Sequence, residues 1–217
     1  MAEAVAEASR RDAARADLCR FVAACYYQPG PEFTEERLFE ALAAAAAEVD
    51  ADLAATAHRL GQAWADTDPT ELLVDYTRLF LGPVKALAQP YASVWLSGEN
   101  LVMQASTVSV KELYEEGGFE IDEAFQDLPD HVAVELEFLY LMNYRELESR
   151  SAGDPARAEK YAALKRRFLD QHLGVWLGSF LEALHREAQT GFYELLAELT
   201  ERLVRLEGLP QPQPRGI

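Results

Sequence analysis

The sequence predicts an all-α fold, a single irregular bundle of about nine helices. Apolar residues recur along most of the chain at the three- and four-residue spacing of one helix face. No run of alternating apolar and polar residues is bounded by the hairpin turns that paired strands need. No segment repeats at a fixed period, which argues against a regular solenoid of stacked repeats.

The N-terminal part of the chain predicts helices that begin at capping residues and end at prolines. The first covers about 10–28 and ends before Pro29. Thr34 is expected to cap the second, which continues through the alanine run at 43–47, because alanine is the best helix former. Asp68 is expected to cap the fourth, with a proline in its first turn and a glutamate three residues after the cap.

Two long connections separate the later helices. The fourth helix is expected to end at Gly82, and residues 83–103 then form a connection with little periodicity. Loops of that length inside a domain are often functional. A second loop, at 119–129, leads into a long helix. The other helices are expected at about 51–65, 107–116, 130–149, 155–172, 175–188 and 190–206.

We interpret the chain as one all-helical domain at 10–207, with a flexible N-terminus at 1–9 and a mobile Pro-rich tail at 208–217. Arg10 and Arg11 look like the start of a twin-arginine export signal. Charged residues follow them where such a signal needs an apolar stretch. No other segment approaches the roughly 18 apolar residues of a membrane span. A cytoplasmic location is therefore expected.

The charge balance limits the classes of partner. Twenty basic and thirty-seven acidic residues give a net charge of −17, which repels nucleic acid and anionic membrane surfaces. A basic peptide or a basic protein face fits better, although acidity also serves solubility. Cys19 and Cys25 are six residues apart in one predicted helix, so they face different directions and predict neither a disulfide nor a metal site.

The sequence lacks the common motifs of catalysis. It has no GxxxxGK[ST] phosphate loop, no GxGxxG after a strand, no GxSxG nucleophile elbow and no HExxH pair. Only four histidines occur, which makes a histidine-rich metal centre a poor hypothesis. None of these particular catalytic, metal-binding or cofactor-binding sites is therefore expected.

One segment combines an apolar helix stripe with an aromatic loop. Leu72, Tyr76, Leu79 and Phe80 share one helical face, which core packing alone would explain. The loop that follows carries aromatic rings among prolines and polar residues, where binding surfaces commonly place them. A groove along this helix and loop would accept an apolar helix or an extended peptide. The loop residues of interest are Pro90, Tyr91, Ser93 and Trp95.

A second segment opens the long helix. Asp130 follows Pro129 and is placed to cap the helix. His131 and Glu135 are four residues apart, so they lie on one face and are able to pair. Four interpretations remain open: a structural cap with a local pair, a metal site that lacks a third ligand, an acid–base couple without a nucleophile, and peptide or protein recognition.

At these two segments the sequence resembles the TorD/DmsD/NarJ family of redox-enzyme maturation chaperones. The family pattern has a Tyr-x-x-Leu-Phe helix, a Pro-Tyr-x-Ser loop, and later an Asp-His pair that opens a long helix. A weaker similarity covers Phe168, His172 and Trp176. The resemblance extends over roughly 12–206 and implies the same irregular helical bundle. The matching residues are Tyr76, Leu79, Phe80, Pro90, Tyr91, Ser93, Asp130 and His131.

The resemblance implies a chaperone rather than an enzyme. Its expected partners are the apo catalytic subunit of a molybdopterin-dependent oxidoreductase and the twin-arginine signal peptide of that subunit. The matching residues, together with Trp95 and Glu135, are then candidates for client contact. A monomer is expected, or a dimer that exchanges helices across the loop at 119–129.

Three alternatives remain. A NarJ-like chaperone would serve a membrane-associated reductase that is not exported. A metal-dependent enzyme using His131 and Glu135 would hold a metal, or a histidine with a strongly shifted pKa in a closed pocket. A helical domain that senses a small molecule would enclose a dry pocket.

Overall fold

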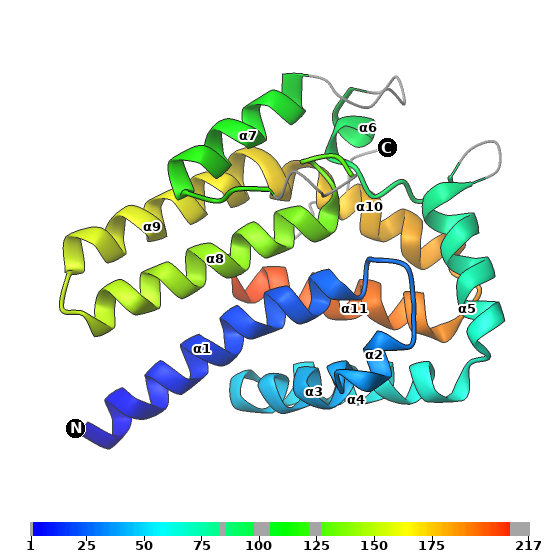
Figure 1. Ribbon diagram of the computed structural model, residues 1–217, viewed down its shortest axis with the longest axis horizontal. Coiled ribbons are helices and arrows are strands. Elements are labelled where there is room, and N and C mark those ends of the chain that lie inside the picture. The colour runs from blue at the N-terminus through cyan, green and yellow to red at the C-terminus, as the bar shows by residue number, and fades with distance from the viewer. Residues whose placement is uncertain (1, 83–85, 98–104, 122–126, 209–217) are drawn as a thin grey trace, which may run out of the picture.

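The computed structural model describes residues 2–82, 86–97, 105–121 and 127–208, and these form an all-α bundle (Figure 1). Parts of both predicted connections, and the predicted tail beyond Gly208, lie outside the described residues. The helices are α1 (Ala2–Ala24), α2 (Glu32–Glu35), α3 (Leu38–Val49), α4 (Ala51–Asp66), α5 (Pro69–Tyr76), α6 (Ala92–Ser97), α7 (Ala105–Gly117), α8 (Val132–Ser151), α9 (Pro155–Phe168), α10 (Gly174–Glu187) and α11 (Gly191–Leu206).

Aspartate caps begin several of these helices. The Asp50 carboxylate accepts hydrogen bonds from the backbone N–H groups at the start of α4. Asp68 caps α5 in the same way, and Asp154 caps α9, each followed by a proline at the first helical position. A carboxylate suits this place because it satisfies free N–H groups at the positive end of the helix dipole. The predicted cap at Asp68 is confirmed, and the helix expected from residue 155 does begin at Pro155.

The N-terminal helices differ from the prediction in three respects. Helix α1 begins at Ala2, so residues expected in a flexible N-terminus are helical. Thr34 does not cap the second long helix; it lies in the short helix α2, and its hydroxyl accepts a hydrogen bond from the Trp64 indole at 3.1 Å. Arg37, which has a left-handed backbone (φ 55°), precedes α3. The Thr34 side chain, which the local pattern assigned to a helix cap, instead makes a tertiary hydrogen bond with Trp64.

Two helices pass into turns of π-helix. Helix α5 continues as η1 (Thr77–Leu81), and α9 continues as η2 (Leu169–Leu173) before α10. The turn η1 ends at Gly82, whose φ of 59° is accessible to glycine at little cost. The end predicted at Gly82 is thus confirmed. Turns of π-helix are rare, and many of those known lie at functional sites.

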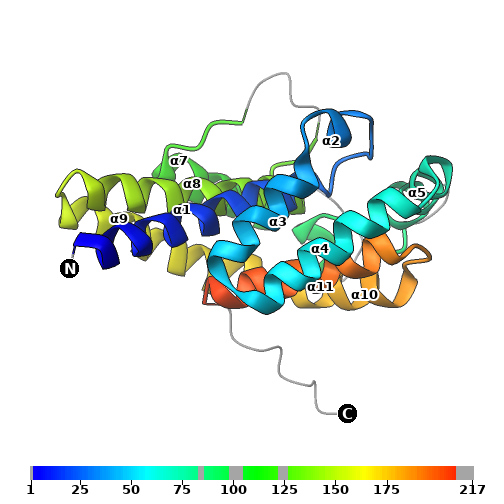
Figure 2. The same ribbon diagram turned by 90° about the horizontal axis from the view of Figure 1, so that it is seen from below.

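The helices pack in layers around one core. Figures 1 and 2 show α1 beside α8, with α9 on the far side of α8 and the α3–α4 pair on the far side of α1. Helix α11 lies against α4 and α10, and α5 closes one end of the molecule. Large side chains fill the interior, where burying each one contributes about 2–3 kcal/mol. The largest fully buried ones are Trp176, Tyr26, Tyr114, Tyr193, Phe138, Phe168, Phe180 and Phe192.

A buried charged network ties four helices together near the end of α11. The Lys165 ammonium lies 3.2 Å from Glu146 and 3.5 Å from Glu207, and it donates to the Asn143 side chain at 2.7 Å. Arg15 of α1 reaches Glu207 at 2.9 Å. The opposite charges compensate one another, which a buried ion requires.

Within the described ranges, none of the helices is both long and apolar enough to span a bilayer.

A buried aspartate connects α5 to the turn before α11. One carboxylate oxygen of Asp75 accepts hydrogen bonds from the backbone N–H groups of Gln189 and Thr190 at 2.9 and 2.8 Å, and from the Thr190 hydroxyl at 2.9 Å. Its other oxygen pairs with Arg78 at 2.7 Å. Asp75, although distant in sequence, therefore accepts the hydrogen bonds of backbone N–H groups just before α11, as a local capping residue does at other helix starts.

Replacing Asp75 with alanine should lower the free energy of unfolding by about 2–4 kcal/mol, because it removes the acceptor of several donors at once. Urea denaturation measures this change. Asp154→Ala is the control, since it removes an exposed local cap and should cost about 1 kcal/mol. An Asp75→Ala variant no less stable than Asp154→Ala would contradict the tertiary role of this carboxylate.

Candidate functional site

The structure brings together the two segments that the sequence singled out. An isolated antiparallel bridge pairs Tyr91 with His131. The carbonyl of Pro90 accepts from the N–H of Val132 at 2.8 Å, and the carbonyl of Asp130 accepts from the N–H of Ala92 at 3.0 Å. Residues 89–97 and 127–135 thus form one unit, here called the α6–α8 junction. Helix α6 itself was not predicted, since it lies inside the expected connection at 83–103.

Asp130 has a different role from the one predicted. It is fully buried, and its carboxylate accepts a hydrogen bond from the backbone N–H of Ser93 at 2.9 Å. It therefore serves the first turn of α6 rather than α8. The cap of α8 is His131, whose Nδ1 accepts from the N–H of Ala133 at 3.1 Å. The local pattern located the helix start within two residues but assigned its cap to the wrong side chain.

His131 lies between two aromatic rings. Its ring is parallel to that of Tyr27 at a centroid distance of 5.9 Å, and the Tyr91 ring meets it edge-on at 5.3 Å. Asp127 lies 3.9 Å from Nε2. Burial lowers the pKa of His131 to about 4, against the opposing effect of Asp127 and Asp130. A neutral ring agrees with the geometry, because only an unprotonated Nδ1 is able to accept the capping hydrogen bond.

The structure does not form the local side-chain pair between His131 and Glu135 that was one of the open interpretations. Glu135 is fully buried and instead accepts from the Trp176 indole at 3.1 Å and hydrogen bonds the Nε2 of His172 at 2.9 Å. Burial raises the pKa of Glu135, which His172 and Trp176 offset only in part. Burial lowers the pKa of His172, but the Glu135 carboxylate outweighs this effect, and the net direction is upward.

Further hydrogen bonds fix the loop that leads into α8. The Tyr91 hydroxyl donates to Asp127 at 2.8 Å, and the same carboxylate oxygen accepts from the N–H of Leu128 at 2.7 Å. The Tyr114 hydroxyl donates to the carbonyl of Pro129 at 2.8 Å. Helix α7 and the loop before α6 therefore hold residues 127–129 in place.

The helix stripe of the first segment is core. Leu79 is fully buried, and Tyr76 and Phe80 are nearly so. Trp95 is half-buried; its indole donates to the carbonyl of Gln89 at 2.8 Å, and its ring packs on Phe180. Of the predicted site residues, Tyr91 and Trp95 are partly exposed, and the others support them from inside.

Several exposed apolar side chains lie in the stretch of sequence that leads into this junction. Nine large apolar residues in the described part of the chain are substantially exposed, and five of them fall between positions 73 and 96. Helices α5 and α6 and the turn η1 carry four of the five, and one precedes α6. Because exposed apolar patches often mark binding sites, this stretch is a candidate binding surface. We call it the α5–α6 apolar surface; its members are Leu73, Val74, Leu81, Leu87 and Leu96.

Four residues that contact His131 or Glu135 were not among the predicted site residues. Tyr27 and Asp127 enclose His131, while His172 and Trp176 bind Glu135. The family resemblance marks His172 and Trp176 only weakly, and no local pattern identifies Tyr27, which lies more than a hundred residues from its partner. Among the described residues, no group of three His, Cys, Asp or Glu side chains is arranged to hold a metal ion.

The fold and this junction define a family. Residues 40–182, about two thirds of the chain, match the family described as the nitrate reductase delta subunit. The chain therefore belongs to that family, the one that includes TorD and NarJ, and the resemblance noted from the two segments is confirmed.

Individual relatives agree with this assignment. The chain is 31% identical over 137 residues to the chaperone protein TorD of Vibrio parahaemolyticus, which covers 63% of this chain and 62% of that one. It is 31% identical over 140 residues to TorD of Escherichia coli, with 63% and 62% covered. The chain thus spans less than two thirds of the length of these relatives.

A solved structure supports the fold. The crystal structure of a proposed redox enzyme maturation protein from Archaeoglobus fulgidus superposes with a TM-score of 0.53 at 21% identity, covering 88% of this chain and 93% of the other. The predicted irregular all-α bundle is confirmed.

The lowered pKa of His131 predicts a loss of stability in acid. The unfolded chain binds a proton near pH 6.5 and the folded chain only near 4, so the contribution is complete above 6.5 and is lost as the pH falls. The loss amounts to roughly 3 kcal/mol between these values. His131→Asn keeps a capping side chain but does not titrate, so urea denaturation from pH 7 to 4 should show a smaller loss for it. Equal losses would contradict the assignment.

The raised pKa of His172 predicts the opposite dependence. Its contribution is complete below pH 6.5 and is lost as the pH rises through the folded value. His172→Gln retains a hydrogen-bond donor for Glu135 without titrating. Between pH 6 and 9, wild type should therefore lose more stability than this variant in the same denaturation series. A variant with an unchanged pH profile would show that His172 does not titrate in this range.

Proposed function

We propose that the protein is a cytoplasmic, non-catalytic chaperone that binds the apo catalytic subunit of a molybdopterin-dependent oxidoreductase before cofactor insertion. We further propose that it binds the twin-arginine signal peptide of that subunit. The observation that carries the proposal is the α5–α6 apolar surface, which lies next to the junction containing the family motifs. Membership of the family and the chaperone names of the relatives support it.

The α5–α6 apolar surface suits a client that is not yet folded. An incompletely folded subunit exposes apolar segments, and these bind best to apolar side chains that are already held in position. Leu87 is held near η1, since its N–H bonds the carbonyl of Arg78 at 3.4 Å, and Leu96 belongs to α6. The junction keeps α6 in place through Asp130, so the surface is formed before a client arrives.

The predicted contact residues then divide into two groups. Tyr91 and Trp95 are partly exposed, and these are the ones we propose to touch the client. The remaining ones act by holding the surface in shape. They are Tyr76, Leu79, Phe80, Pro90, Ser93, Asp130, His131 and Glu135.

The net charge agrees with a client that carries basic residues. A twin-arginine signal joins two arginines to an apolar stretch, and a chain with a net charge of −17 attracts the arginines. Such attraction accelerates association and weakens as salt is added.

A second candidate function follows from the family description. Because the family is described by the nitrate reductase delta subunit, the client alternatively is a membrane-associated reductase subunit that is not exported. The two candidates share the surface and differ in whether the client carries a signal peptide.

Affinity capture of the tagged protein from its native cells, followed by mass spectrometry, should recover a molybdoenzyme catalytic subunit. An intact signal peptide on that subunit favours the exported client, and its absence from the subunit's gene favours the second candidate. Recovery of no such subunit, when it is shown to be expressed, would refute the chaperone function.

Changing Leu81 and Leu96 together to aspartate should reduce the captured subunit roughly tenfold, because charge replaces exposed apolar contacts. Leu206→Asp is the matched control: Leu206 is similarly exposed, at 41%, but lies at the end of α11. Both variants should denature at the same urea concentration as wild type. Undiminished capture by the double variant would remove this surface from the proposed binding site.

A further inference from the structure

A pocket opens at the end of the molecule where α4 meets α5. It has a volume of about 690 Å³, and we call it the α4–α5 pocket. Segment 29–34 forms one wall, the end of α4 forms the floor, and the start of α5 forms the other wall. Most of its lining is apolar, with Pro29, Pro31, Trp64, Leu72 and Leu73 as the large contributors.

The floor of this pocket is rigid. Trp64 packs against the rings of Phe33 and Phe39 at 5.2 Å each and of Phe192 at 5.9 Å, and its indole donates to Thr34 on the opposite wall. A ring fixed on several sides loses little further freedom when a ligand binds. The pocket is therefore already formed in the free protein.

Leu73 stands at the mouth of the pocket. It lines the cavity and yet is 40% exposed, and the neighbouring Val74 is 58% exposed. Leu73 is thus both a wall of the pocket and one end of the α5–α6 apolar surface. A segment bound at that surface is able to continue into the pocket.

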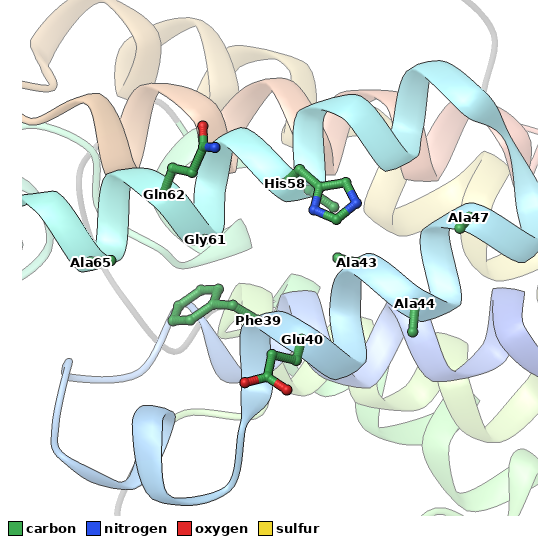
Figure 3. A pocket seen from close by; sticks show the side chains of 10 residues that line it. Phe39, Glu40, Ala43, Ala44, Ala47, His58, Gly61, Gln62 and Ala65 are labelled. Carbon is green, nitrogen blue, oxygen red and sulfur yellow. The ribbon is translucent and has the colours of Figure 1, made fainter.

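The opposite side of the pocket continues into a second depression. Ala65 lines both the α4–α5 pocket and a shallow groove of about 520 Å³ between α3 and α4 (Figure 3). Small residues line this groove, and Gly61 allows the close approach, since a Cβ there would lie 3.2 Å from Phe39. The Glu40 side chain extends from α3 at its edge (Figure 3). The pocket and the groove together are therefore long enough to contact more than one side chain of a bound segment.

The charged residues in the two segments that line the pocket are all acidic, and we call their carboxylates the acidic rim. Segments 28–36 and 64–74 contain no lysine or arginine. Their exposed carboxylates form no ion pair among the described residues; these are Glu32, Glu35, Glu36, Asp66, Asp68 and Glu71. The nearest basic residue in sequence, Arg37, is paired with Glu40. An apolar cavity whose lining segments carry only negative charge is complementary to an apolar side chain with cationic neighbours.

We propose that the α4–α5 pocket binds an extended segment of a partner protein in which an apolar side chain is flanked by lysine or arginine. The apolar side chain enters between Trp64 and Leu73, and its basic neighbours lie against the acidic rim. That this partner is the client rests on the proposed function. That the pocket binds a segment of this chemistry does not depend on it. The pocket is separate from the α6–α8 junction and adds a second point of attachment.

The test uses fluorescence anisotropy with the full-length protein and a labelled eight-residue peptide that carries two leucines between arginines. Two matched peptides replace the arginines by glutamate or the leucines by serine. The first peptide should bind at low salt and roughly tenfold more weakly at about 0.5 M salt, since screening removes the rim attraction. Equal binding of the glutamate or the serine peptide would overturn the proposal.

Protein variants locate the binding. Leu73→Asp and Glu71→Lys should each weaken the first peptide roughly tenfold. Leu206→Asp is the apolar control, and Glu148→Lys, an exposed charge near the far end of α8, is the charge control; both should bind as wild type does. Unchanged circular dichroism and urea midpoints must accompany any loss. Normal binding by Leu73→Asp would place the peptide elsewhere and overturn the proposal.

The outcome is distinguishable from failure of the proposed function. The Leu81 and Leu96 double variant should lose client capture and keep peptide binding. If Leu73→Asp binds the peptide normally while the double variant loses the client, the pocket proposal fails and the chaperone function stands. If Leu73→Asp loses the peptide but no client is ever captured, the pocket stands and the chaperone function fails.

Discussion

Three ionisable residues at the first turn of α8 impose the constraint on which the rest of the site depends. Asp130, His131 and Glu135 are all buried, and burying such groups is costly unless each finds a partner. The partners come from three different parts of the chain: Ser93 of α6, Tyr27 after α1, and the pair His172 and Trp176. The turn therefore forms fully only when these elements meet, and it holds them in register once they do.

This constraint explains how a small helix carries a binding surface. Helix α6 has six residues, too few to be stable alone. It is held by the Asp130 carboxylate, by the backbone bridge between Tyr91 and His131, and by the contact of Trp95 with Phe180. The leucines Leu81 of η1 and Leu96 of α6 therefore remain exposed at the surface. The same packing of α6 against the start of α8 thus buries polar side chains inside and leaves apolar ones exposed outside.

Charge acts at a longer range than these contacts. The acidic rim of the α4–α5 pocket and the overall charge of −17 both favour ligands with basic residues. Apolar contacts contribute most of the binding affinity, whereas charge increases the association rate and the specificity for basic ligands. The α5–α6 apolar surface and the pocket meet at Leu73, so one extended ligand is able to use both.

The sequence by itself determined the all-α class, most helix limits and the cap at Asp68, because periodicity, proline, glycine and local capping act over a few residues. It also marked the two segments of the junction through their resemblance to a family. Only the tertiary structure decided which partners the polar side chains take. Thr34 binds Trp64, Asp130 binds Ser93, and Glu135 binds His172, each against the local expectation. A side-chain oxygen has equally good donors near and far in sequence, and packing of the core decides which of them it meets.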